Sequence, residues 1–321
     1  MFFDDFPRFF ETSSVIPKRG RLNLRYEAIF GENSDIFQGA RVLDLASHDG
    51  RWSFAALRTG AAHVTGIEAR QEAVDNASAN LAHYGADPDS YRFICGDIFD
   101  VLRREDFEVD VVLCLGYLYH TYRHTELLYR IRQIDPQHLL VDTQVVPVRD
   151  KPFVKLYVDR PHKPGEAALD PFSHGMTTLV GRPSIPALQM MLRAYDFEIE
   201  HTCDWHALMA KHPDAGIVHD YANGERVTLR CRSGASIPPT PSATTGSGVS
   251  GSTSTTITPP DASLIPTVAA PNEAEQPVAR VTARKGWRDL VNRGLARATG
   301  YELRRAARSH HQATGSEPSQ E

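Results

Sequence analysis

The chain has 321 residues, which is enough for one large domain or two modest ones with a sizeable core. Hydrophobic residues make up 41% and charged residues 23%, as in an ordinary soluble protein. The formal net charge of −5 argues against a protein that coats nucleic acid over its whole surface, and no apolar run approaches the roughly 18 residues of a membrane span.

The N-terminal stretch MFFDDFPRFF carries acids where a secretory signal would be basic, so we expect no signal peptide. The four cysteines lie far apart, mostly within strand-like apolar runs, and no Cys, His or carboxylate cluster has metal-ligand spacing. We therefore predict buried free thiols, no metal and a cytoplasmic location. The cysteines are Cys95, Cys114, Cys203 and Cys231.

Apolar runs typical of strands alternate with amphipathic runs typical of helices from residue 41 onward. In chain order the expected elements are strand 40–46, helix 52–60, strand 63–69, helix 71–85, strand 91–97, helix 98–105, strand 109–116, helix 124–134, strand 138–146, helix 183–196 and strands 197–205 and 225–232. This alternation predicts a Rossmann-like, doubly wound, seven-stranded α/β sheet, mostly parallel with an antiparallel edge strand. Segments 151–159 and 174–181 are expected as two further strands, inserted near the ligand-binding end of the sheet.

The composition divides the chain into four parts. Residues 1–40 are predicted as a helical or irregular lead-in, and 41–232 as the main domain. Residues 233–279 are rich in Ser, Thr, Gly and Pro and predict a disordered linker. Residues 280–321 predict a basic amphipathic tail, in which eight cations between 284 and 308 face only two acids.

Acids and small residues stand where the expected strands end. In an open α/β sheet, ligands bind beyond these carboxyl ends, where the strand order reverses. The turn DLASHDG, residues 44–50, has a single glycine and therefore fits neither a Rossmann GxGxxG motif nor a P-loop. Glu68 ends the second strand and suits both hydroxyls of a ribose, while Asp97 ends the third and suits an adenine amino group. This layout favours a cofactor that contains an adenosine but no phosphate.

At these residues the chain resembles the class I S-adenosylmethionine-dependent methyltransferases over roughly residues 25–232. The family turn is commonly DxGxGxG, and Ala46 and His48 replace its first two glycines here. The resemblance implies S-adenosyl-L-methionine as cofactor. It also implies that Asp44 orients the methionine ammonium and that Glu68 holds the ribose. Together the cofactor-binding residues implied are Asp44, Ala46, Ser47, His48, Gly50, Glu68, Ala69, Asp97, Ile98 and Leu115.

The segment LGYLYHTYRHTELL follows the fourth strand, where this fold places the groups nearest the transferred methyl. Because a hydroxyl nucleophile needs a base, His120 is the first catalytic candidate and His174, in a segment expected over the cleft, the second. Each has the alternative of a purely structural histidine. The LYH segment and residues 181–200 also resemble a methyltransferase branch that includes the tRNA wobble-uridine carboxymethyltransferases.

The sequence thus predicts an O-methyltransferase acting on a small molecule, a sugar or a lipid-linked glycan. The alternatives are an RNA-modifying, tRNA-type methyltransferase and a non-catalytic cofactor-binding module of the same fold. The basic tail leaves three interpretations open: a peripheral contact with the inner face of an anionic membrane, binding to an RNA backbone, or a solvated tail without a fixed partner.

Overall fold

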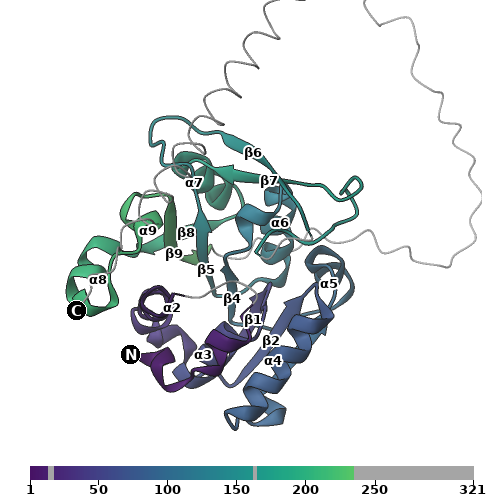
Figure 1. Cartoon of the computed structure of the whole chain (residues 1–321). Coiled ribbons are helices and arrows are strands. Elements are labelled where there is room, and N and C mark those ends of the chain that lie inside the picture. Colours follow the sequence, from purple (N-terminus) through teal and green to yellow (C-terminus); the bar gives the residue numbers. More distant parts are fainter. Residues whose placement is uncertain (14–17, 162–164, 235–321) are drawn as a thin grey trace, which may run out of the picture. The chain divides into compact units, whose positions relative to one another are not determined.

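The computed structural model describes residues 1–13, 18–161 and 165–234, which belong to one compact unit. A seven-stranded sheet runs through these residues in the order β3-β2-β1-β4-β5-β9-β8 (Figure 1). The predicted linker and basic tail lie outside the described residues, except that the last strand includes Ser233, one residue beyond the predicted boundary. The strands are β1 (Arg41–Leu45), β2 (His63–Glu68), β3 (Tyr91–Cys95), β4 (Val111–Leu115), β5 (His138–Gln144), β8 (Phe197–Thr202) and β9 (Arg226–Ser233).

The predicted fold class is confirmed. Strands β1 to β5 pair in parallel, and β9 pairs antiparallel with both β5 and β8. The antiparallel strand β9 lies one place inside the edge, and β8 forms the edge itself. From β1 the chain winds outward through β2 to β3, and then returns to β4 on the other side of β1. The strand order therefore reverses between β1 and β4, the place where such sheets bind ligands.

Helices cover both faces of the sheet (Figure 1). Alternate residues of the central strand β4 point to opposite faces, and all five are buried, which explains the uninterrupted apolar run in its sequence. Val112 and Cys114 join a core with α5, α6 and α7, whereas Val111 and Leu113 join a second core with α3 and the N-terminal segment. The helices are α1 (Arg8–Glu11), α2 (Arg19–Tyr26), α3 (Arg51–Thr59), α4 (Gln71–His83), α5 (Ile98–Arg104), α6 (His124–Ile134), α7 (Ile185–Ala194), α8 (Trp205–Lys211) and α9 (His219–Ala222).

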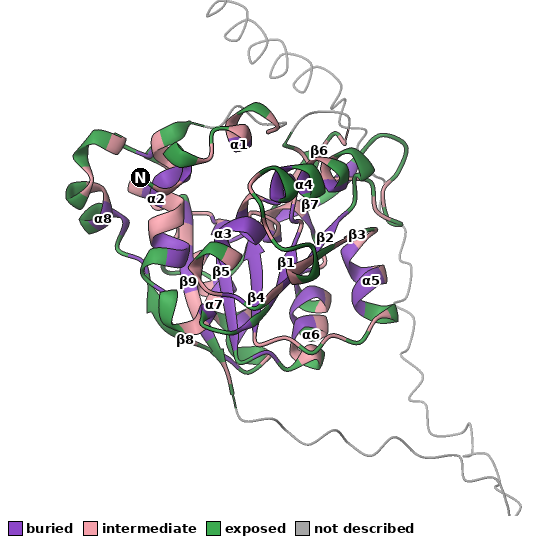
Figure 2. Cartoon of the chain, turned by 90° about the horizontal axis from the view of Figure 1, so that it is seen from below, coloured by how far each residue is buried: buried purple, intermediate pink, exposed green. Residues whose placement is uncertain are grey.

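The N-terminal lead-in packs onto the domain through aromatic side chains. The Phe2 ring stacks on Tyr26 with 3.9 Å between centroids, and Phe6 meets the edge of Tyr84 in the loop after α4. The Tyr84 hydroxyl accepts a hydrogen bond from the Arg8 backbone N–H at 2.8 Å. Figure 2 shows buried residues concentrated in the central strands and on the inner sides of the helices. The lead-in thus completes one of the two cores.

The two inserted strands form their own sheet. Strand β6 (Val154–Asp159) pairs antiparallel with β7 (Thr178–Pro183), and this hairpin connects β5 to α7 (Figure 1). The prediction of two extra strands at this place is confirmed.

Three of the four cysteines are buried, and Cys95 is exposed, because β3 is an edge strand and this residue lies at its end. The prediction of a buried thiol was wrong for Cys95. All four are free thiols. Among the described residues, no helix combines the length and apolarity needed to cross a bilayer.

Candidate active site

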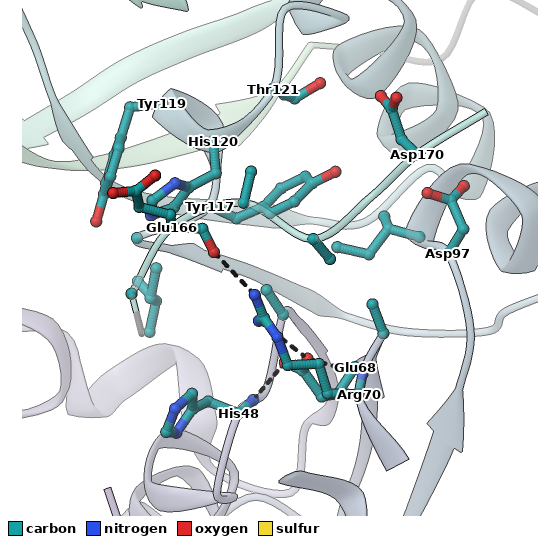
Figure 3. Close-up of a pocket in the computed structure, with 18 of the residues that line it drawn as sticks. His48, Glu68, Arg70, Asp97, Tyr117, Tyr119, His120, Thr121, Glu166 and Asp170 are labelled. Atoms are coloured by element: carbon teal, nitrogen blue, oxygen red, sulfur yellow. Dashed lines mark hydrogen bonds and ion pairs between the residues drawn. The ribbon is translucent and has the colours of Figure 1, made fainter. Parts of the chain in front are cut away.

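One cavity of about 260 Å³ opens at the carboxyl ends of β1, β2 and β4, beside the point where the strand order reverses. The loop 165–170, between the strands of the inserted hairpin, lines its opposite side (Figure 3). We call the strand-end side of the cavity the floor and residues 165–170 the roof. Eight of the predicted site residues lie on the cavity wall: Ala46, His48, Glu68, Ala69, Asp97, Ile98, Leu115 and His120.

The turn after β1 keeps the backbone path of a glycine-rich turn without its glycines. Ala46, His48 and Gly50 all have left-handed backbones, with φ of 59°, 52° and 76°. These are the three glycine positions of the DxGxGxG pattern. A left-handed backbone costs a non-glycine residue roughly 1–2 kcal/mol, so the surrounding contacts must hold Ala46 and His48 in place. The substitutions noted in the sequence therefore leave the path of the turn intact.

Glu68 is the residue that holds this turn against β2. It is buried, and its two carboxylate oxygens accept hydrogen bonds from the backbone N–H of His48 and of Arg70, each at 3.1 Å. Each oxygen retains acceptor capacity toward the cavity, because a carboxylate can accept about four hydrogen bonds. The side chain can therefore fix the turn and accept from a ligand's hydroxyls at once.

Asp97 lies across the cavity from the turn and caps α5, where its Oδ1 accepts from the Asp100 backbone N–H at 3.0 Å. Ile98 follows it on the wall and belongs to the core under α5. Asp170 of the roof extends toward the same end of the cavity (Figure 3). This end therefore offers two carboxylates beside an apolar surface, which suits an amino-bearing ring.

Four predicted site residues do not line the cavity. Asp44 and Ser47 are buried beneath the turn, and Gly50 begins α3 where a Cβ would meet Ala77 and Leu81. Ser47 and Gly50 contribute to the path of the turn, and Asp44 accepts a hydrogen bond from Ser53 of α3. His174 lies in a short turn closed by backbone hydrogen bonds to Thr177, outside the cavity wall, so the structure does not support it as a catalytic group.

Asp44 nevertheless carries an unusual charge state. Its Oδ2 accepts from the Ser53 hydroxyl at 2.7 Å, while Oδ1 is buried without a hydrogen-bond partner among the described residues. Burial raises the pKa of Asp44 to about 7, and the nearby negative charge of Glu68 adds to this increase. A positively charged group near Oδ1 would favour the ionised form of Asp44.

His120 is oriented by a residue of the inserted hairpin. Its Nδ1 lies 3.0 Å from Oδ2 of Asp159, the last residue of β6, and the same oxygen accepts from the Ala167 backbone N–H at 3.0 Å. Burial alone would raise the pKa of Asp159, but the hydrogen bonds from His120 and Ala167 lower it below its usual value. Because the carboxylate only accepts, Nδ1 of His120 donates and Nε2 remains available to accept a proton.

Several wall residues were not predicted from the sequence. Arg25 of α2 lies over the Trp52 ring at 4.8 Å and donates to Asp142 at the end of β5. Arg70 donates to the Glu166 backbone carbonyl at 2.8 Å and so connects the floor to the roof (Figure 3). Arg70 had a signal in the sequence, since it follows the strand end at Glu68, and Gly116 and Thr121 lie in the segment expected nearest the transferred methyl. The other unpredicted wall residues include Arg51 and the roof.

Residues 42–134 match a protein-family model described as a methyltransferase domain. The matched range covers the β1 turn, Glu68, Asp97 and His120, and thus much of the cavity wall opposite the roof. This part of the chain is therefore a methyltransferase domain, in agreement with the predicted resemblance.

The ribosomal RNA large subunit methyltransferase I of Pseudoalteromonas translucida (strain TAC 125) is 42% identical to this methyltransferase over 67 residues. The matched segment spans 20% of this chain and only 17% of that relative. The fold is also similar to solved structures. The N-terminal domain of EvdMO1, in the presence of S-adenosylhomocysteine and D-fucose, is 19% identical with a TM-score of 0.45, over 68% of this chain and 84% of that one. An S-adenosylmethionine-dependent methyltransferase from Mesorhizobium loti is 15% identical with a TM-score of 0.45, over 65% and 97%.

A methyltransferase domain agrees with the predicted cofactor, S-adenosylmethionine, and the site residues fit it. Glu68 has acceptor capacity for the ribose, and Asp97 with Ile98 suits the adenine. The unpartnered Oδ1 of Asp44 suits a cationic group such as the methionine ammonium, directly or through water. The described residues contain no group of three His, Cys, Asp or Glu side chains arranged for a metal ion.

Proposed function

We propose that this methyltransferase transfers a methyl group to a hydroxyl oxygen of a small molecule, a sugar or a lipid-linked glycan, with His120 as the general base. The observation that carries the proposal is His120 on the cavity wall, paired with Asp159 behind it. A hydroxyl is a poor nucleophile until its proton is removed, and general-base catalysis typically contributes ~10²–10⁴-fold to such a reaction. A site without a base would suit a more nucleophilic acceptor instead.

S-adenosylmethionine, when bound, would supply a methyl group on a positively charged sulfur, and this sulfur would keep the electron pair of the broken carbon–sulfur bond as the acceptor oxygen took the methyl group. The hydroxyl proton passes to Nε2 of His120, whose positive charge the Asp159 carboxylate then stabilises. Holding acceptor and cofactor in line in one cavity supplies much of the remaining rate.

The first test is calorimetric titration with S-adenosylmethionine and S-adenosylhomocysteine, beside NAD as a control. The proposal requires binding of the first two and none of NAD. The second test follows the release of S-adenosylhomocysteine with a panel of sugars and glycolipids. His120→Gln should lower turnover by ~10²–10⁴-fold with unchanged cofactor affinity. The matched variant His206→Gln alters an exposed histidine of α8 and should leave turnover unchanged. Full turnover by His120→Gln would exclude a catalytic base at this position.

RNA methylation is a second candidate, because the curated relative with the 67-residue match acts, by its name, on ribosomal RNA. The net charge of −5 argues against it, and the basic stretch 284–308 supports it. Transfer of labelled methyl to RNA, abolished by removal of residues 281–321, would favour this candidate. The same stretch supports a peripheral location at an anionic membrane in the cytoplasm, which vesicle binding by the intact and truncated chains would test.

A further inference from the structure

One face of the β6–β7 hairpin extends outward from Asp159, the partner of His120. Lys155, Tyr157 and Asp159 alternate along β6 and therefore point to the same side of the hairpin. Their cross-strand partners on β7 share that side, and Lys155 stands directly opposite Arg182. Asp159, at the inner end, is the residue that orients His120. The face thus begins at the proposed base and ends at two cations.

The two cations surround the aromatic ring between them. The guanidinium carbon of Arg182 lies 4.3 Å from the centre of the Tyr157 ring, and Nζ of Lys155 lies 5.2 Å from it. We call Lys155, Tyr157 and Arg182 the cationic face. Two positive charges on one ring repel each other, so the arrangement favours an anion between or beside them.

Neither Lys155 nor Arg182 forms an ion pair within the part of the chain that the structure describes, and Nε of Arg182 is buried there without a hydrogen-bond partner. The carboxylate whose charge acts on Arg182 is Asp159, which also accepts hydrogen bonds from His120 and the Ala167 N–H. Other arginines near the cavity are paired, as Arg25 and Arg226 are with Asp142. An unpaired buried donor on a guanidinium is a position at which an acceptor oxygen from a ligand would be stabilised.

The spacing gives the size of the ligand that would use this face. At about 3.3 Å per residue, Tyr157 lies about 7 Å and Lys155 about 13 Å from Asp159 along the strand. If a hydroxyl of the acceptor lies at His120, a group about one sugar ring or slightly more away from that hydroxyl would therefore reach the cationic face.

We propose that the cationic face binds a phosphate group of the acceptor, which places the neighbouring sugar hydroxyl at His120. This proposal rests on the proposed function and narrows its substrate class to phosphorylated sugars, soluble or carried as the headgroup of a glycolipid. A phosphate has enough acceptor oxygens to bind the lysine and the arginine together, and the planar guanidinium suits it well.

The test is calorimetric titration of the full chain, loaded with S-adenosylhomocysteine, with glucose 1-phosphate and with uncharged glucose. The wild type should bind the phosphate ester more tightly than glucose. Arg182→Gln and Lys155→Gln should each weaken that binding by about tenfold, the loss of one charge-assisted hydrogen bond. Lys151→Gln is the matched control, because it removes an exposed cation just before β6 and outside the cationic face. Two variants are used so that a folding defect in one does not decide the result.

Vesicles of equal parts phosphatidylcholine and phosphatidylglycerol separate the two sources of phosphate. Binding to glucose 1-phosphate that depends on Arg182 and Lys155 supports a soluble acceptor. Binding to the vesicles alone, with the same dependence, supports a lipid-linked one. Binding to neither probe overturns the proposal, and so does binding that is insensitive to both substitutions. A single-stranded RNA is the third probe: binding to it alone, weakened as much by Lys151→Gln as by the two face variants, would also overturn the proposal.

The readout of this experiment is binding rather than turnover. Methyl transfer without phosphate binding would therefore overturn the cationic face and leave the proposed function standing. Phosphate binding without methyl transfer to any acceptor would support the cationic face and overturn the proposed function.

Discussion

The floor and the roof of the cavity are built in different ways. The floor consists of buried strand ends, where the Glu68 carboxylate accepts from two backbone N–H groups, and it is supported by Arg25 of the cavity wall, which is paired with the buried Asp142 behind it. The roof is partly exposed: Arg70 donates to its Glu166 carbonyl, and its Ala167 N–H donates to Asp159, which also bonds His120. A surface with few contacts can change without loss of the fold. We infer that the floor fixes the cofactor and that the roof adapts to the acceptor.

Asp142 provides the sharpest contrast with the roof. This buried carboxylate receives hydrogen bonds from Arg25, Arg226, Tyr221 and Thr228, which hold its pKa at about 2 although burial alone would raise it. Asp142→Ala removes the carboxylate shared by the buried Arg226, which keeps only Asp220, and the half-buried Arg25, and it should lower the free energy of unfolding by about 3–5 kcal/mol. Asp159→Ala, beside the roof, should lower it by about 1 kcal/mol or less. Urea unfolding of both variants measures the difference.

The pH dependence of the free energy of unfolding provides a control for the comparison between Asp142 and Asp159. A carboxylate whose pKa is lower in the folded than in the unfolded protein stabilises the fold above the unfolded value near 4. This contribution is lost as the pH falls toward 2. The difference between wild type and Asp142→Ala should therefore be constant near neutral pH and shrink in acid. Equal losses for the two variants at pH 7 would contradict the contrast between floor and roof.

Glu68 tests whether the floor alone determines cofactor affinity. Glu68→Gln keeps the size of the side chain but replaces one acceptor oxygen by a donor, so it cannot accept from both His48 and Arg70. The affinity for S-adenosylhomocysteine should fall by about tenfold or more, since hydrogen bonds to a charged group contribute about 1.5–3 kcal/mol. Calorimetry should show no such change for the roof-side variant Asp159→Asn. A similar loss in both variants would mean that the roof also holds the cofactor.

Asp44 predicts a pH dependence of cofactor binding. Its raised pKa of about 7 means that the cofactor-free protein holds a proton there at lower pH, and that proton must leave before a carboxylate can face the methionine ammonium. Affinity should therefore weaken as the pH falls below about 7, by at most about tenfold per unit. Asp44→Asn should bind more weakly at pH 7.5 and lose this dependence. An unchanged slope in the variant would assign the titration to another group.

The same residue should also affect the stability of the cofactor-free protein. A carboxyl group whose pKa is higher in the folded protein lowers stability progressively as the pH rises from about 4 to 7, and the cost is constant above that range. Asp44→Asn should thus be less sensitive to pH than wild type in thermal unfolding over this range.

The cofactor side of the cavity follows from local sequence, and the acceptor side does not. Glu68 and Asp97 could be predicted because parallel strands bring their ends to one edge of the sheet, so the order of strands is enough to place them. Arg25 is 117 residues from its partner Asp142, and Asp159 is 39 residues from His120. Such pairs depend on how an N-terminal helix and an inserted hairpin pack, and no periodicity in the sequence encodes that packing. The sequence also located the hairpin strands but not the face that carries the cations.

In the β1 turn, non-glycine residues adopt a backbone conformation that favours glycine. The smallest predicted effect concerns this turn. Ala46 adopts the left-handed conformation that glycine adopts freely, so Ala46→Gly removes strain but adds freedom to the unfolded chain. The net result should be a gain of about 0.5–1 kcal/mol in the free energy of unfolding, with cofactor affinity kept. Ala79→Gly, at an exposed position within α4, should lose about the same amount because its backbone is helical. If both substitutions destabilised equally, the turn would not be strained at Ala46, and the floor would owe its shape to the side chains around it.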